Sequence, residues 1–168
     1  MYHKENLHLL TITALFSASI TVMTAYILHI PIPTGGYIHL GDTLIYLAAC
    51  LLPLPYAVAA ASIGAGLADV LSGAAMWAPA TLVIKAALVL FFTNRHERIL
   101  CLRNSAAVVL AGLFSPAAYA LSACVMSGTM TVFIPQFLGT LVQGIGSGAL
   151  FLVIVPAMDG VKLKERLA

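Results

Sequence analysis

Long apolar runs alternate along this chain with short breaks that are rich in proline, glycine or charge. A membrane-spanning helix needs about 20 predominantly apolar residues, with a range of roughly 17–25. The pattern predicts six helical segments, at residues 7–30, 40–54, 56–71, 78–93, 105–127 and 135–157. Segments two and three are short for full spans. A re-entrant hairpin is the alternative for them, and it requires that protein covers the backbone.

The breaks between segments set the expected orientation. Four of them, at 31–36, 53–55, 72–79 and 127–136, carry no charge, whereas 94–104 ("NRHERILCLRN") is charged. Lysine and arginine in short loops mark the cytoplasmic side of a membrane. A six-helix topology with both termini in the cytoplasm places seven of the eight cationic residues on the cytoplasmic side. They are Lys4, Arg95, Arg98, Arg103, Lys162, Lys164 and Arg166.

Composition supports the membrane class. The chain is 61% hydrophobic and 8% charged, with a mean hydropathy of +1.03, whereas soluble domains carry about 25% charged residues. We therefore predict an all-α, multi-pass membrane protein with one domain over residues 1–168. The run at 7–30 exceeds the 7–15 apolar residues of a signal peptide and is interpreted as a retained helix.

Several classes of chemistry have no sequence support. A phosphate-binding G-x-x-x-x-G-K-[ST] loop is missing, so the chain is not expected to hydrolyse ATP itself. The three cysteines, Cys50, Cys101 and Cys124, are isolated from one another, which argues against a metal or redox site. A net charge of +2, with no basic patch interleaved with aromatics, gives no reason to expect nucleic-acid binding. We expect no cofactor and no enzymatic activity.

Two charged residues fall well inside apolar segments, where each costs roughly 2.5–3.5 kcal/mol at a helix centre. Asp69 lies in segment three and Lys85 in segment four. At a rise of about 1.5 Å per residue, both come out in the outer half of the membrane at similar depth. We therefore predict an Asp69–Lys85 ion pair. Its role is either to fix helix register or to contact a ligand directly.

Other polar side chains gather in the same outer half: His29, Trp77, Tyr119, Gln136 and Gln143. These and His39 are the residues considered for a ligand site, and Tyr119 is not expected to touch the ligand. The inner half carries only weakly polar residues, such as threonine, serine and glycine. The pattern therefore predicts an outward-facing polar pocket that is closed on its inner side by small, apolar packing. Each candidate also has a structural alternative. Trp77 could anchor the membrane interface, and the glutamines could join helices.

Small residues in the first segment suggest a docking surface. Ala14 and Ala18 form a small-xxx-small motif, which lets another helix approach closely. Such motifs are common in membrane helices, so packing inside the protein is the alternative.

The order of motifs over residues 35–85 resembles a known family. G-x-I-H-L-G-D, G-x-G-L-A-D, W-A-P-A-T and a lysine follow one another, ending at Asp42, Asp69, Thr81 and Lys85. This order is similar to that in S components of energy-coupling factor (ECF) vitamin transporters, specifically the hydroxymethylpyrimidine- and pyridoxine-type branch. The resemblance implies a substrate-capture subunit in the cell membrane of a prokaryote.

The resemblance also implies partners and a site. An S component works with a transmembrane T component, which Ala14 and Ala18 would face, and with two cytosolic ATPases. It is thought to topple in the membrane to deliver its vitamin inward. Family sites draw on the first loop, segment four, the segment 5–6 loop and segment six. Carried onto this chain, they imply the residues Tyr37, His39, Trp77, Lys85, Gln136 and Gln143.

The stretch "GGYIHLGDTLIYLAA" (35–49) then becomes the rim of the pocket. Gly35 and Gly36 would let the loop act as a lid. His39 would face the ligand. Asp42 would sit in the first helical turn, within reach of water, favoured by the helix dipole and able to cap the next amides.

Pyridoxine or hydroxymethylpyrimidine is the leading ligand, ahead of a queuosine precursor, riboflavin or thiamine. Two further classes remain open, an autonomous permease or channel, and an intramembrane enzyme that uses His39, Asp42 and Lys85.

Overall fold

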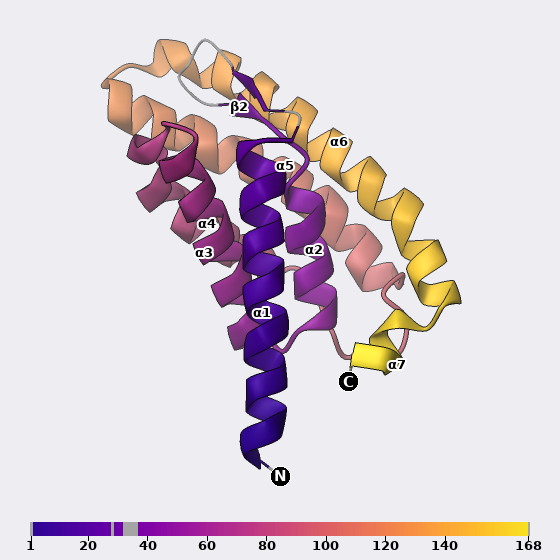
Figure 1. The fold of residues 1–168 in the computed structure, drawn as a ribbon. Helices are drawn as coiled ribbons and strands as arrows, with labels where there is room; N and C mark the ends of the chain where they lie inside the picture. The colour runs from indigo at the N-terminus through magenta and orange to yellow at the C-terminus, as the bar shows by residue number, and fades with distance from the viewer. Residues whose placement is uncertain (1, 28, 32–36, 168) are drawn as a thin grey trace.

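The computed structural model describes residues 2–27, 29–31 and 37–167, with side chains for 6–27, 29–31 and 37–166. This part of the chain is almost wholly helical (Figure 1). The elements in order are α1 (Tyr2–Ala25), β1 (Ile30–Pro31), β2 (Tyr37–Ile38), α2 (Asp42–Leu51), α3 (Leu54–Leu71), the 3-10 turn η1 (Ala75–Trp77), α4 (Ala78–Val89), α5 (Leu102–Ser127), the 3-10 turn η2 (Met130–Val132), α6 (Phe133–Gly160) and α7 (Leu163–Leu167). The predicted lid glycines, Gly35 and Gly36, lie outside the described residues.

Four of these helices are long and apolar enough to cross a membrane. They cover Asn6–Ala25, Leu54–Leu71, Leu102–Ser127 and Met130–Gly160. Two further apolar segments, Asp42–Leu51 and Ala75–Val89, are shorter. The all-α membrane fold is thus confirmed. Six full spans, and the orientation with both termini inside, stay predictions.

The predicted short segments need a correction. Segment two is short, as α2 has 10 residues, but α3 has 18 and reaches full spanning length. It begins at Leu54 because a proline is tolerated in the first helical turn, where its missing N–H has no helical partner. The second short helix is α4, which ends at Val89 rather than at residue 93 and has 12 residues.

Small residues let helices pack closely. On α3, a Cβ added to Gly64 would lie 2.7 Å from the backbone oxygen of Ser17 on α1, and the Thr21 hydroxyl of α1 donates to the Gly64 carbonyl at 2.9 Å. Between α5 and α6, a Cβ on Gly144 would lie 3.2 Å from the Cα of Gly112. Close backbone approach of this kind is the usual way in which helices associate where both are apolar.

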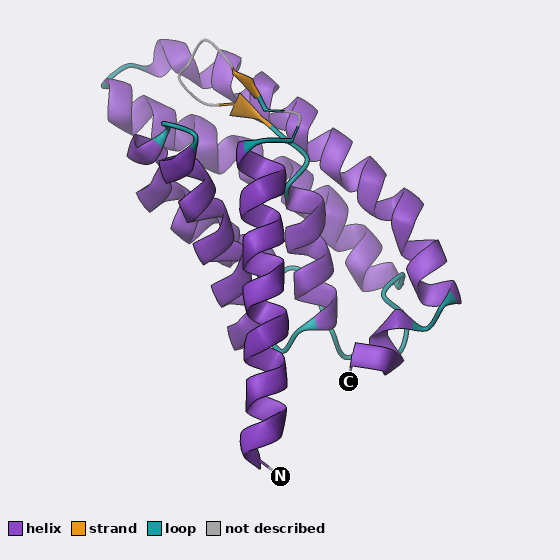
Figure 2. Cartoon of the chain, in the orientation of Figure 1, coloured by secondary structure: helices purple, strands orange, loops and turns teal. Residues whose placement is uncertain are grey.

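The two ends of the bundle differ. At one end, which we call the hairpin end, β1 and β2 pair antiparallel, with Ile30 opposite Ile38, and lie across the helix ends (Figure 2). The other end, which we call the basic end, carries the N-terminus, α7 and the segment between α4 and α5 (Figure 1).

Side chains hold the basic end together. The Asp159 carboxylate of α6 accepts the backbone N–H groups of Ile99 at 2.8 Å and Leu100 at 2.9 Å. Lys164 of α7 donates to the backbone oxygens of Asn94 and His96. The charged segment between α4 and α5 is therefore fixed against α6 and α7.

An aromatic layer fills the bundle between its two ends. Tyr46 of α2 stacks on Phe92 at a ring-centroid distance of 4.8 Å, and Phe151 of α6 meets both rings edge-on at 5.9 and 6.0 Å. Tyr46 and Phe151 are wholly buried, and Phe92 is nearly so. This layer places apolar packing between the hairpin end and the basic end, as the pattern of polar residues predicted.

Candidate binding site

A pocket opens at the hairpin end, with about 320 Å³ of empty space, part of it continuous with solvent. Strand β2, the turn before α2, and elements α3, η1, α5 and α6 all contribute to its wall. The lining residues are Tyr37, His39, Asp69, Trp77, Tyr119, Gln136, Thr140 and Gln143.

Aromatic rings form one part of this wall. Trp77 and Tyr119 are tilted against each other with centroids 6.0 Å apart, and both are largely buried. Tyr37 stacks on His29 at a ring-centroid distance of 4.0 Å, which helps to fix the Tyr37 ring in the pocket wall. Aromatic faces of this kind suit a flat ring, because offset and tilted ring pairs are favourable.

A polar stripe on α6 forms another part. Gln136, Thr140 and Gln143 are spaced four and three residues apart, so they lie on the same face of the helix. All three are buried. The Gln136 amide donates to the Thr140 hydroxyl at 3.1 Å. Buried amides and a hydroxyl along one face give the pocket fixed hydrogen-bonding positions.

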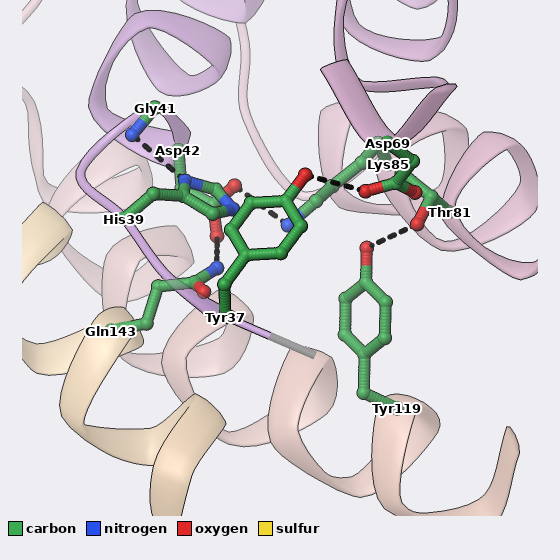
Figure 3. Close-up of polar contacts among 9 residues, drawn as sticks. All are labelled: Tyr37, His39, Gly41, Asp42, Asp69, Thr81, Lys85, Tyr119 and Gln143. Atoms are coloured by element: carbon green, nitrogen blue, oxygen red, sulfur yellow. Dashed lines mark hydrogen bonds and ion pairs between the residues drawn. The ribbon is translucent and has the colours of Figure 1, made fainter. Parts of the chain in front are cut away.

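A buried ion pair stands behind the polar stripe. Lys85 Nζ of α4 lies 2.6 Å from Asp42 Oδ1, and both side chains are 1% exposed. Asp42 Oδ2 accepts a hydrogen bond from the Gln143 amide at 2.9 Å (Figure 3). The carboxylate therefore joins the start of α2 to both α4 and α6.

This pair corrects two predictions. The partner of Lys85 is Asp42, not Asp69. The Asp42 carboxylate is also not a solvated helix cap, because it is fully buried and makes no capping hydrogen bond. Lys85 is not paired with Asp69 because the two residues lie at different depths in the bundle. Lys85 lies seven residues into α4, about 10 Å along it, whereas Asp69 lies two residues before α3 ends, about 3 Å from that end.

Asp69 has a different partner. The Tyr37 hydroxyl donates to Asp69 Oδ1 at 2.6 Å, which ties β2 to α3. Burial and the Asp69 charge raise the pKa of Tyr37, so its hydroxyl keeps the proton that it donates. Beside them, the Tyr119 hydroxyl donates to the Thr81 hydroxyl at 2.9 Å (Figure 3).

His39 lies in the turn between β2 and α2 and is 6% exposed. The Gly41 N–H donates to its Nδ1 at 3.0 Å. Burial lowers the pKa of His39 to about 4, so the ring is neutral at pH 7. Since Nδ1 accepts, the proton of the neutral ring sits on Nε2, and His39 offers the pocket a donor.

Gly41 itself is required by close packing. A Cβ at this position would overlap the Thr24 hydroxyl of α1. The turn that carries His39 can therefore lie directly against α1, which brings the ring over the pocket.

The structure brings together five of the six predicted substrate-binding residues. Tyr37, His39, Trp77, Gln136 and Gln143 line the pocket. Lys85 does not, because its ammonium group is held by Asp42 and lies 5.1 Å from the Tyr119 ring centroid. Ligand contact by these residues stays a prediction.

The residues predicted from sequence omit three that line the pocket. Asp69 is predicted for the ion pair instead, Tyr119 is a polar residue at the right depth without a motif, and Thr140 belongs to no motif at all. The signal for Thr140 is its spacing, one helical turn from Gln136 and nearly one from Gln143.

The predicted docking residues are exposed on α1. Ala14 and Ala18 are exposed, together with Leu15, whereas Thr21 is buried against α3. Packing inside this chain therefore does not account for the Ala14/Ala18 motif. Docking of a partner helix there stays a prediction.

The geometry defines a class first, that of a helical membrane protein with a polar binding pocket at one end of an apolar bundle. A sequence model of the family described as "ECF-type riboflavin transporter, S component" matches residues 4–159. The match covers nearly the whole chain, which belongs to this family of ECF S components. A search of curated proteins found no match.

Family membership settles the general role. The chain is an integral membrane protein and the substrate-binding subunit of an ECF vitamin transporter. S components are transport proteins rather than enzymes, and they act with a T component and ATPases.

Proposed function

We propose that the pocket at the hairpin end captures a small, single-ring heteroaromatic vitamin or vitamin precursor, with pyridoxine or hydroxymethylpyrimidine leading. The observation that carries this is the pairing of aromatic faces, Trp77 and Tyr119, with the buried polar stripe of α6 in one cavity. Ligand sites typically combine mostly apolar walls with a few well-placed polar groups.

Pocket size supports the single-ring choice. Its empty space of about 320 Å³ includes a part open to solvent, so the enclosed part is smaller and favours a ligand with one ring. Riboflavin, named in the description of the matching family, is the second candidate. Its three fused rings need more room than one ring.

The charge distribution supports a pocket that faces outward. Arg95, Arg98, Lys162 and Lys164 all belong to the segments that meet at the basic end. Positive residues favour the cytoplasmic side, so the hairpin end would face out. The aromatic layer of Tyr46, Phe92 and Phe151 separates this pocket from the basic end. We propose that transport therefore depends on the T component and two ATPases rather than on a path through this chain.

Ligand identification tests the proposal directly. Protein purified in detergent is analysed by mass spectrometry for a co-purified compound, and is then titrated calorimetrically with pyridoxine, hydroxymethylpyrimidine, riboflavin and thiamine. Tight binding of a single-ring compound is the expected result. Tight binding of riboflavin alone would replace the leading ligand with the second candidate.

Assays of uptake and of ligand conversion distinguish a capture subunit from a permease or an enzyme. Uptake into vesicles that contain this chain without the ATPase module would indicate an autonomous permease. Conversion of a ligand to product by the purified chain would indicate an enzyme. We expect neither.

A further inference from the structure

Asp69 is a buried carboxylate on the pocket wall with only one of its oxygens in a complete hydrogen bond. Its side chain is 5% exposed, and Oδ1 accepts the hydrogen bond from Tyr37 at 2.6 Å. Oδ2 is also buried. The Thr81 hydroxyl lies near the carboxylate, but Oδ2 accepts no hydrogen bond of good geometry from the described residues. A buried polar atom without a partner is costly, more so when it carries charge. The second oxygen can therefore accept a further donor inside the ligand pocket.

The charge of Asp69 is also without an ion-pair partner among the described residues. Lys85, whose charge acts on Asp69, is bound to Asp42 at 2.6 Å. His39 on the pocket wall is neutral at pH 7. When Asp69 is ionised, its charge is therefore not balanced by a cation of the pocket wall.

Building on the proposed function, we infer that Asp69 Oδ2 accepts a hydrogen bond from a nitrogen-bound hydrogen of the ligand, so the site selects heteroaromatic rings that carry an amino group or a protonated nitrogen. Tyr37 acts as a positioning residue, since its hydroxyl occupies Oδ1 and leaves Oδ2 for the ligand. This assigns Asp69 to substrate recognition rather than to the ion pair.

The surrounding side chains fit the same ligand. Trp77 and Tyr119 offer ring faces beside Asp69, and His39 offers a donor from Nε2. Gln143 donates its amide hydrogen to Asp42, which leaves its carbonyl oxygen as an acceptor. A ring with N–H donors on one edge and a ring-nitrogen acceptor on another matches this set. A ring edge that presents only acceptors would set lone pairs against the Asp69 carboxylate.

The test uses a matched pair of ligands on wild-type protein. The probes are 4-amino-5-hydroxymethyl-2-methylpyrimidine and the same compound without the 4-amino group, titrated calorimetrically at pH 7. A hydrogen bond to a charged group predicts about 10- to 100-fold tighter binding of the amino compound. Equal binding of the two, or tighter binding of the compound without the amino group, would overturn the assignment.

A variant series checks that Asp69 is the cause. Asp69→Asn keeps the shape and can still accept from Tyr37, but it places an amide in place of the charge. It should reduce the preference for the amino compound to about threefold or less, since the charge-assisted bond is lost. Tyr37→Phe should retain the preference, because the carboxylate remains. Glu97→Gln removes the same charge from an exposed position at the basic end and should change nothing.

The two proposals fail in different ways. If neither the two pyrimidines nor pyridoxine bind wild-type protein that a thermal melt shows to be folded, the single-ring function is wrong and this inference falls with it. If both bind but the amino group confers no advantage, or Asp69→Asn keeps the full preference, only the role of Asp69 is wrong. Even if Asp69→Asn does not fold, the comparison of the two pyrimidines on wild-type protein still tests the role of Asp69.

Discussion

Asp42, the first residue of α2, forms a buried ion pair with Lys85 of α4 at an Nζ–Oδ1 distance of 2.6 Å. The same carboxylate binds the Gln143 amide of α6. Three helices that are far apart in sequence therefore meet at one charge. The short helix α2 buries its apolar side chains in the core and is also fixed by these polar contacts at its first turn.

Breaking this pair should destabilise the protein. Asp42→Asn or Lys85→Met alone leaves a buried charge without its partner, which costs about 3–5 kcal/mol. The double variant should lose clearly less stability than the two single variants together, because no unpaired buried charge remains. Denaturation in detergent measures the free energy of unfolding of the wild type, the two single variants and the double variant, which together form a double-mutant cycle. A parallel cycle of Asp69→Asn with Lys85→Met serves as control, and a larger coupling there would restore the pairing predicted from sequence.

Gln143→Ala should weaken ligand binding by about 10-fold or more, because a buried hydrogen-bonding group is removed from the pocket wall. Expression should be unaffected. Calorimetry with the best ligand measures the change. Val142→Ala, one residue away and 59% exposed, is the matched control and should bind normally. Wild-type affinity in Gln143→Ala would exclude this side chain from the site.

Acid should destabilise the protein through His39. Its pKa in the folded state is about 4, below the ordinary 6.5, so between these pH values the unfolded chain takes up a proton that the folded chain does not. Stability is full above pH 6.5 and falls as the pH drops toward 4, by up to about 3 kcal/mol. The groups that face His39 are Asp42, Lys85 and His29.

His39→Asn isolates this contribution. The asparagine carbonyl can replace Nδ1 as the acceptor for Gly41 but does not titrate. Melting temperatures measured from pH 7 to pH 4.5 should therefore fall less steeply in the variant than in the wild type. Equal slopes would mean that another group is responsible for the acid sensitivity.

Ala14→Trp should abolish uptake by the complete transporter while detergent-purified protein still binds ligand. Ala14 is exposed on α1, away from the pocket, and a large ring there would hold a partner helix at a distance. Uptake and calorimetry on the same variant separate the two effects. Val83→Trp, at a 70% exposed position of α4, controls for a large ring on the surface. Normal uptake in Ala14→Trp would remove the docking assignment.

The sequence by itself determined the class of this protein and the position of its pocket along the helices. Hydropathy is a local property, so runs such as 105–127 predict membrane helices without any knowledge of packing. Polar residues in membrane helices carry a free-energy cost and usually have a function. Gln136 and Gln143 therefore indicated which end of the bundle is polar. The motifs over 35–85 were enough to indicate the family to which the chain belongs.

Only the tertiary structure decided which charges meet. Depth along a helix depends on where that helix ends, and a shift of a few residues moves a side chain by a full turn. Because α4 begins at Ala78 and α2 inserts between α4 and α6, Lys85 reaches Asp42. Asp69 is left to Tyr37, a residue of a two-residue strand too short to show in any pattern. The lateral position of a helix in a bundle is set by packing between segments that are distant in sequence. For this reason no local pattern could have placed Asp69 on the pocket wall.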